Sequence, residues 1–447
     1  MRTRLITVVA LGATALLPAT ATAADYPPAQ SPGKVKTPRK GKGKVFTVCQ
    51  RKGCRYTTIQ KAVDKARGGD TIRVKAGTYR QGAKVVGPRY DGLKIVGDVK
   101  RPRRVQLDAR KVSGARAQNG VLVNNADGVS VRGLFARGFR ANGFFFVNVD
   151  GYTVAHLVAG DNGVYGIYAF NSKGGTMSDS EAYHSNDAGF YIGQTPRQAK
   201  PKRTIVSRVR SYENVVGFSG TNMRYTTVTR SQLFNNSVGL VPASEKGEKF
   251  APPEFNVISD NDVFWNNFNP YRGAPFRIPR KGPIGLASYP IGIGVILLGG
   301  QDTTVERNRI YGNWLSGYAG IEQVTLKGEK SPALREAAVL RNNTVRNNVF
   351  GLGGRDLNGR DMYYDGSGTG NCFSGNATTT INLPADNSTF SPCPGPARNP
   401  FNQSVQGEAF GWALEGKKSD PASFEKHWIR HPHVLKKGLE PVVKYGR

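Results

Sequence analysis

The feature that most constrains the fold is a repeat of about 23 residues that runs through the middle of the chain. Each repeat has an Asn, then a Gly three or four residues later, then apolar or aromatic residues, as in "AGDNGVYGIYA" and "SYENVVGFSG". The Gly that opens each apolar stretch serves as a marker, at Gly120, Gly143, Gly166, Gly189, Gly217 and Gly239. The steps between these markers are 23, 23, 23, 28 and 22 residues. Such a period is typical of a solenoid.

A second apolar segment recurs at a fixed distance from the markers. It ends 11 residues after the marker in five repeats, at Val131, Val154, Met177, Val228 and Val305. After a long insertion the repeat resumes at Gly294, and further candidate markers are Gly317 or Gly320, and Gly351. β-Branched, aromatic and Gly residues dominate, and the "LxxLxL" spacing of leucine-rich repeats is missing. Each repeat is therefore predicted to form one coil of a parallel β-helix, with about nine or more coils stacked at ~4.8 Å.

With these repeats the chain resembles the right-handed parallel β-helix repeat superfamily, which includes pectate-lyase-like proteins and periplasmic accessory proteins of nitrous-oxide reductase. The resemblance covers residues 45 to 380, and "YTTIQKAVDKARGGDTIRVKAGTYRQG" is similar to the N-terminal module of such proteins. In that stretch Ile59, Ala62, Val63 and Ala66 share one helical face behind a Thr cap. The predicted fold is all-β, a right-handed parallel β-helix whose first coil is covered by an N-terminal capping helix.

The two ends of the chain depart from the repeat. Residues 1–23 have a basic start, an apolar run and a terminal "ATA", which indicate a secretory signal peptide. Residues 24–44 are rich in Pro, Gly and Lys and are predicted to be a disordered linker. The β-helix domain is predicted to span 45–394, and 395–447 to form a cap or tail. No later stretch predicts a transmembrane segment, so we expect a secreted, extracellular or cell-envelope protein.

The four cysteines form two pairs that are close in the sequence. Cys49 lies near Cys54, and Cys372 lies near Cys393. In an oxidising compartment the expected pairing is two local disulfides, although sequence alone leaves other connectivities open.

The chain is strongly basic. It has 63 Lys and Arg against 32 Asp and Glu, for a formal net charge of +31. Such a charge attracts polyanions, and the expected partner is an acidic polysaccharide or an anionic cell-envelope polymer. No nucleic-acid-binding motif is present, so nucleic acid is not an expected partner. The alternative is that the charge serves solubility alone. The chain is expected to be a monomer.

The Asn residues of the repeat are predicted to belong mostly to the scaffold. Asn tolerates left-handed geometry at a tight corner and bonds neighbouring backbone, and stacked Asn side chains can also bond each other. One corner is predicted to contain Asn162, Asn186, Asn214, Asn236, Asn313 and Asn348. Another is predicted to contain Asn261, Asn308 and Asn343. The marker Gly is expected to permit the turn itself.

The outer face of the Gly-led strand is the predicted binding surface. Alternation sends the residue two places after the marker outward, so Phe145, Tyr168 and Tyr191 are predicted to form an exposed stripe that stacks on sugar rings. The fifth place after the marker holds amides, at Asn125, Asn148, Asn171, Gln194 and Asn222. Loops that cover the stripe are the alternative for the aromatic residues. Another corner ladder is the alternative for the amides.

Three basic insertions follow the same strand and are expected to wall this groove. They span 194–203, 242–254 and 326–336, and all carry Lys or Arg. The predicted substrate-binding residues are Phe145, Tyr168, Tyr191, Gln194, Asn222 and Arg224.

The candidate catalytic residues are His184 and Asp187, in the loop that enters the Tyr191 strand. Glu213 takes a similar place one coil later. A His and a carboxylate beside a glycan groove can transfer protons in β-elimination or epimerisation. The alternative is corner hydrogen bonding. The outward positions are aromatic or Ser, so the Asp cluster of calcium-dependent lyases is not predicted.

No cofactor or metal is expected. The chain has four Met and five His, with no soft-ligand cluster suited to copper. Two functions therefore remain open: a secreted lyase or epimerase that acts on an acidic polysaccharide, and a non-catalytic β-helix protein that binds an envelope or matrix glycan.

Overall fold

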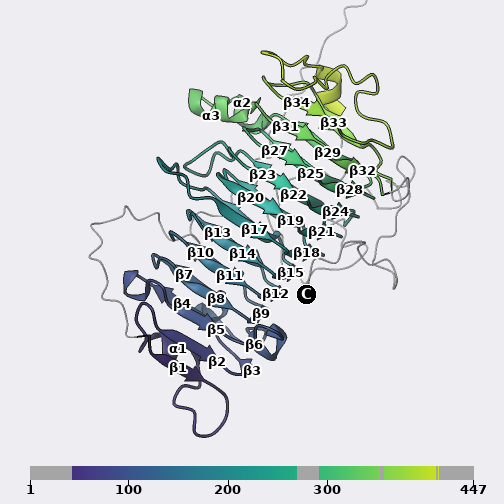
Figure 1. Ribbon diagram of the computed structural model, residues 1–447. Coiled ribbons are helices and arrows are strands. Elements are labelled where there is room, and N and C mark those ends of the chain that lie inside the picture. The colour runs from purple at the N-terminus through teal and green to yellow at the C-terminus, as the bar shows by residue number, and fades with distance from the viewer. Residues whose placement is uncertain (1–42, 269–290, 353–356, 409–410, 412–447) are drawn as a thin grey trace, which may run out of the picture.

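The chain folds as a long solenoid of short strands (Figure 1). The computed structural model describes residues 43–268, 291–352, 357–408 and 411. The predicted signal peptide, nearly all of the predicted linker and most of the predicted tail lie outside these residues.

Three parallel sheets form the sides of the solenoid. Sheet A contains β1 (Val45–Val48), β2 (Thr71–Val74), β5 (Lys94–Val96), β8 (Ser130–Arg132), β11 (Thr153–Ala155), β14 (Thr176–Ser178), β17 (Thr204–Ser207), β20 (Thr226–Thr229), β23 (Val257–Ser259), β27 (Thr304–Glu306), β31 (Thr344–Arg346) and β34 (Cys372–Ser374). Sheet B contains β3 (Gly77–Tyr79), β6 (Val105–Asp108), β9 (Phe135–Arg137), β12 (Val158–Gly160), β15 (Glu181–Tyr183), β18 (Arg210–Tyr212), β21 (Gln232–Phe234), β24 (Asp262–Phe264), β28 (Arg309–Tyr311) and β32 (Val349–Phe350). Sheet C contains β4 (Ala83–Val86), β7 (Asn119–Asn124), β10 (Asn142–Val147), β13 (Ile167–Phe170), β16 (Ala188–Gly193), β19 (Val216–Thr221), β22 (Val238–Ala243), β25 (Ile293–Leu298), β29 (Ser316–Ile321) and β33 (Met362–Tyr364).

Each coil supplies one strand to sheet A, then to B, then to C, before the next coil begins. The short strands β26 (Gly300–Gln301) and β30 (Leu340–Arg341) pair separately. The helices are α1 (Ile59–Val63), α2 (Val324–Lys327) and α3 (Pro332–Ala338), with 3-10 turns η2 (Pro88–Tyr90), η3 (Pro102–Arg104) and η4 (Gly114–Ala117). The predicted fold, a right-handed parallel β-helix, is confirmed.

The marker glycines stack on one another in sheet C, but not because they form the turn. A Cβ on Gly143 would lie 2.6 Å from the carbonyl oxygen of Gly166, and one on Gly166 would lie 2.5 Å from that of Gly189. None of these three glycines has a positive φ. The prediction that the marker permits the turn is therefore wrong, because the missing side chain instead lets neighbouring coils approach.

The structure shows which of the later candidate markers continue the column of glycines in sheet C. Gly317 continues the column, since a Cβ on Gly294 would meet the carbonyl oxygen of Gly317 at 2.6 Å. Gly351 does not continue it. That residue follows β32 in sheet B and has a φ of +76°.

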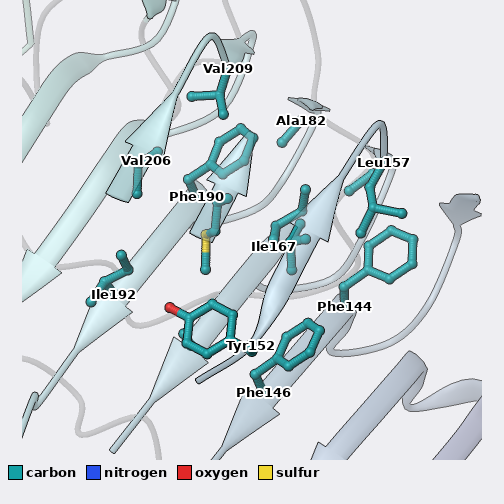
Figure 2. Packing of buried hydrophobic residues seen from close by; sticks show 14 of the residues in the cluster. Phe144, Phe146, Tyr152, Leu157, Ile167, Ala182, Phe190, Ile192, Val206 and Val209 are labelled. Atoms are coloured by element: carbon teal, nitrogen blue, oxygen red, sulfur yellow. The ribbon is translucent and has the colours of Figure 1, made fainter. Parts of the chain in front are cut away.

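The interior of the solenoid is filled by the inward residues of each strand. Phe144, Ile167 and Phe190 come from successive coils and point into the same core (Figure 2). Each is fully buried. The first coil is covered by α1, where the Thr58 hydroxyl accepts a hydrogen bond from the Lys61 amide at 3.2 Å. The apolar face of α1 is buried, as predicted.

Asn ladders run along the corners between the sheets. At the corner between B and C, the side-chain amide of Asn214 donates to Asn236 at 3.2 Å, and that of Asn236 to Asn266 at 3.0 Å. This ladder continues to Asn313 and Asn358. Left-handed geometry is found at the residue before the ladder Asn, because Glu213 and Asn235 have φ values of 55° and 54°.

Three predicted ladder positions need correction. Asn348 accepts from Asn308 at 2.9 Å and so lies at the corner between A and B. Asn343 donates to Asn371 at 2.9 Å in a third ladder, at the corner between C and A. Ser185 takes the ladder place expected for Asn186, and its amide donates to Asn214 at 2.8 Å.

Both expected disulfides are formed. Cys49–Cys54 joins β1 to the loop before α1, and Cys372–Cys393 joins β34 to the segment that follows it. Of the helices in the described part of the chain, none has the length and hydropathy to cross a bilayer.

Candidate functional site

The outward column of sheet C is aromatic as predicted, but it is not exposed. Phe145, Tyr168 and Tyr191 are 3%, 1% and 6% exposed. They form a cluster on the outside of the sheet, separate from the interior core. The corner residue Tyr165 packs against Tyr168 and Tyr191, with ring centroids 4.6 and 4.7 Å apart. The predicted open stripe is therefore wrong, because side chains from outside the strands cover it.

The amide row is a corner ladder. Its five members have φ values between 26° and 56°, and the Asn171 side chain donates to Asn148 at 2.7 Å. Gln194 and Asn222 also hold an insertion. Gln194 Oε1 accepts from the Lys249 amide at 2.6 Å, and Asn222 exchanges hydrogen bonds with the Glu245 backbone at 2.8 and 3.0 Å. These two side chains fix the loop, so their predicted contact with substrate is not supported.

Arg224 also fixes the insertion. Its side chain is fully buried, forms an ion pair with Glu254 and donates to the carbonyl oxygens of Thr195 and Phe250. Burial lowers the pKa of Arg224, while the hydrogen bond that Arg224 donates to Glu254 opposes that shift. A guanidinium held in this way is not available to a glycan, so the predicted substrate-binding role is corrected to a structural one.

The insertion brings a carboxyl group to the outer face of sheet C. The hydroxyls of Tyr191 and Thr221 donate to Glu248 Oε1 at 2.9 and 2.7 Å. The other oxygen, Oε2, is buried and has no hydrogen-bond partner within the described residues. Burial raises the pKa of Glu248 to about 7, although the Thr221 and Tyr191 hydroxyls oppose the shift. A carboxyl group that titrates near neutrality beside a phenol is typical of a functional site.

Glu248 was missed by the sequence prediction. The Lys residues of the insertion that contains it predict a basic wall of the groove and give no indication of a buried acid. The available signal was an acid in a loop that directly follows a binding-face strand.

His184 lies between two carboxylates on adjacent coils. Its Nδ1 is 2.9 Å from Asp161 Oδ1, and its Nε2 is 2.8 Å from Glu213 Oε2. Burial alone lowers the pKa of His184, but the hydrogen bonds to Asp161 and Glu213 outweigh it and raise the pKa to about 9. The ring is therefore an imidazolium at neutral pH. This arrangement links three coils at one corner.

Asp187 is not the carboxylate that the His184 ring nitrogens contact. It lies directly before β16 and its amide donates to the carbonyl oxygen of Val164 at 3.0 Å. Because both ring nitrogens are engaged by Asp161 and Glu213, the geometry favours the corner-bonding alternative for His184.

A second outward aromatic column lies on sheet B. The rings of Tyr183 and Tyr212 stack at 5.5 Å, and the stack continues through Phe234, Phe264 and Tyr311. The sequence signal was an aromatic residue two places before each corner residue, as in "RSYEN", "QLFNN", "DVFWN" and "RIYGN".

The half-buried end of this column is tied into a polar network. Arg103 donates to the Tyr183 hydroxyl at 3.0 Å and to Glu181 at 2.5 Å, and the Tyr212 hydroxyl donates to Glu181 at 2.6 Å. These polar groups satisfy one another. The stacked rings of this column therefore connect neighbouring coils on the outside of sheet B, as the Asn ladders do at the corners.

Several known proteins are similar to parts of this chain. A family model described as "NosD: Periplasmic copper-binding protein (NosD)" matches residues 76–275. No curated protein matches the chain. Similar solved structures include the A-module of mannuronan C-5 epimerase AlgE6 from Azotobacter vinelandii, with 16% identity over 72% of this chain and 94% of that chain and a TM-score of 0.48. The catalytic domain of a GH87 α-1,3-glucanase has 14% identity over 77% of this chain and 67% of that chain, with a TM-score of 0.48. Pectate lyase Pel9A has 16% identity over 76% of this chain and 78% of that chain, with a TM-score of 0.41. Its own strand pairing and repeats show that the chain has the right-handed parallel β-helix fold.

Proposed function

We propose that the protein is secreted, that it engages polysaccharide on the outer face of sheet C, and that it acts there as a lyase or epimerase on an acidic glycan. One observation carries the proposal. Glu248 is a carboxyl group with a buried, unpartnered oxygen, and it is bonded to the Tyr191 hydroxyl on the face where the insertions gather. The two disulfides support an oxidising compartment.

The chemistry of both reactions begins with removal of the proton on the sugar carbon next to the carboxylate. A general base is most effective when its pKa is near the working pH. Glu248, with its pKa near 7, is suited to accept that proton. In β-elimination the bond to the leaving oxygen then breaks, and the role proposed for the Tyr191 hydroxyl, which is bonded to Glu248, is to protonate that oxygen. In epimerisation the Tyr191 hydroxyl gives its proton to the same carbon from the opposite face, and the proton taken by Glu248 passes back to Tyr191 through the hydrogen bond between them.

The first prediction is that Glu248→Gln removes turnover while binding persists. The amide keeps the shape of the side chain but cannot accept the proton, so we expect a loss of about 100-fold or more in kcat. Turnover is measured on a panel of uronate polymers, by the absorbance of unsaturated products and by NMR of the sugar configuration. Glu245→Gln, in the same insertion, is the matched control and should keep full activity. Unchanged turnover in a folded Glu248→Gln variant contradicts the proposal.

The second candidate function is a non-catalytic glycan-binding protein. One observation favours it. Carboxylates contact both ring nitrogens of His184, so that residue has a structural role and not a catalytic one. Polymer binding by the wild-type protein with no turnover on any member of the panel would select this function.

We do not assign copper binding. All four cysteines are in disulfides, and across the described ranges no group of three or more His, Cys, Asp and Glu is placed to hold a metal ion. His427, His431 and His433 lie outside those ranges.

A further inference from the structure

The positive charge of the chain is concentrated at the N-terminal end of the solenoid. Residues 43–117 contain 20 Lys and Arg and 5 Asp and Glu, a balance of +15, whereas residues 118–447 contain 36 and 26, a balance of +10. All 20 cations are exposed, and Asp64 is the one exposed acid of the five. Within the described residues, four of these cations lie within 4.0 Å of a carboxylate: Arg101, Arg103, Arg104 and Arg110. Most of the charge is therefore available to a partner.

This basic end contains a cavity of about 230 Å³. It lies between α1, β4, η4 and β7, and its lining includes the side chains of Gln60, Gln81, Lys84, Arg116, Asn119 and Leu122. We call it the Lys84–Arg116 subsite.

The subsite lies in line with the candidate functional site. Lys84 pairs in register with Leu122, and Leu122 with Phe145. The same column continues through Tyr168 to Tyr191, whose hydroxyl bonds Glu248. The subsite and the Glu248 cluster therefore lie on the same outer face of sheet C, with the covered aromatic column between them.

The residues of the subsite combine three kinds of contact. Lys84 and Arg116 are exposed cations without a carboxylate within 4.0 Å in the described part of the chain, and they suit a carboxylate ligand. The Gln60 side chain is fixed by the Lys84 backbone, since its Oε1 accepts from the Lys84 amide at 2.7 Å. The neighbouring amides suit hydroxyls, and Leu122 suits the apolar face of a ring. A sugar that bears a carboxylate matches all three.

We propose that the Lys84–Arg116 subsite binds a carboxylate-bearing sugar of an acidic polysaccharide that lies along the outer face of sheet C, and that the basic end draws the polymer to it. The inference rests on the proposed glycan function. It commits to an acidic polysaccharide, because amides and an apolar contact add nothing to the recognition of a bare phosphate polymer.

The second prediction is that Lys84→Glu combined with Arg116→Glu weakens binding of a uronate polymer by about tenfold or more. Affinity is measured by calorimetry with polygalacturonate and alginate at about 0.05 M and about 0.5 M salt, where screening differs strongly. Arg230→Glu combined with Lys330→Glu is the matched control. It makes the same change in net charge elsewhere on the surface and should lose less than about threefold. Lys84→Gln combined with Arg116→Gln provides a milder variant if the reversal impairs folding.

Three results would overturn the inference. They are equal losses in the subsite and control variants, equal binding of a neutral dextran, and binding of a phosphodiester polymer as tight as that of the uronates. The result for the subsite variant can be distinguished from the result for Glu248→Gln in the first prediction. Loss of affinity in the subsite variant with full turnover in Glu248→Gln supports the subsite and rejects the catalytic pair, and the reverse pattern does the opposite.

Discussion

His184 occupies a corner at which successive coils bring the same position together. Coils stack at ~4.8 Å, so like charges at one corner would repel strongly. The order Asp161, His184, Glu213 alternates a carboxylate, a cation and a carboxylate. The imidazolium thus links three coils. The hydrogen bond from His184 also lowers the pKa of Asp161.

The third prediction follows from the raised pKa of His184. A folded-state pKa of about 9, against an ordinary value of 6.5, stabilises the fold fully below pH 6.5, and this stabilisation is lost as the pH rises through 9. The ring is 27% exposed, so we expect deprotonation of His184 to lower the free energy of unfolding by about 1–3 kcal/mol. Urea unfolding at about pH 6 and about pH 9.5 measures the drop. His184→Gln should lose this component, whereas His156→Gln, at another corner, should keep it. An identical pH dependence in the wild type and His184→Gln would reject the assignment.

At the scale of the strand, the distance between stacked coils depends both on the marker glycines, which lack a side chain, and on the corner Asn side chains. The marker glycines have no Cβ, so the backbone of each coil can contact the next. The corner Asn side chains then bond across the same distance. These two features fix both the spacing and the register of the coils. A side chain at a marker position would therefore disturb both the spacing and the register of the coils.

The fourth prediction concerns Gly166→Ala. The added Cβ would lie 2.5 Å from the Gly189 carbonyl oxygen and 2.8 Å from the Ala182 Cβ, so the two coils must separate. We expect a loss of about 1–3 kcal/mol or more in unfolding free energy. Urea unfolding is the measurement, and Gly328→Ala, where a Cβ meets nothing within 4 Å, is the control. A variant as stable as the wild type would show that the coils yield without cost.

For the whole molecule, stability is close to a sum of contacts between neighbouring coils. The ends have a neighbour on one side only, and each described disulfide lies near an end. Cys49–Cys54 accompanies β1, the first strand of sheet A, and Cys372–Cys393 accompanies β34, the last. The disulfides are thus placed where coil contacts alone are weakest.

The fifth prediction is that Cys49→Ser combined with Cys54→Ser frays one end and spares the middle. A disulfide that closes a short loop contributes a few kcal/mol at most, about 3 or less. Hydrogen exchange should therefore quicken in β1 and α1 while β13, β16 and β19 keep wild-type protection. Cys372→Ser combined with Cys393→Ser should act in the same way at the other end. Uniform loss of protection along the solenoid would contradict this nearest-neighbour behaviour.

The sequence predicted the coils because each structural requirement is repeated many times. The period, the inward residues such as Phe144 and Phe190, and the capping helix all follow from such patterns. What covers an outward residue is not repeated. Tyr168 is buried by contacts that only the folded chain brings together. Glu248 gains its environment in the same way, from one insertion that folds back onto β16 and β19.

The uneven charge affects how the molecule is oriented as it approaches an anionic surface. A rod that carries +15 on residues 43–117 and +2 on the described residues from 118 onward, from 23 Lys and Arg against 21 Asp and Glu, has an electric dipole along its axis. In the field of an anionic surface such a rod experiences a torque, and it turns its N-terminal end forward. Encounters are then oriented: the first coils arrive first, and the far end points into solvent. Added salt weakens this alignment over the Debye length, so orientation is lost before the fold is affected.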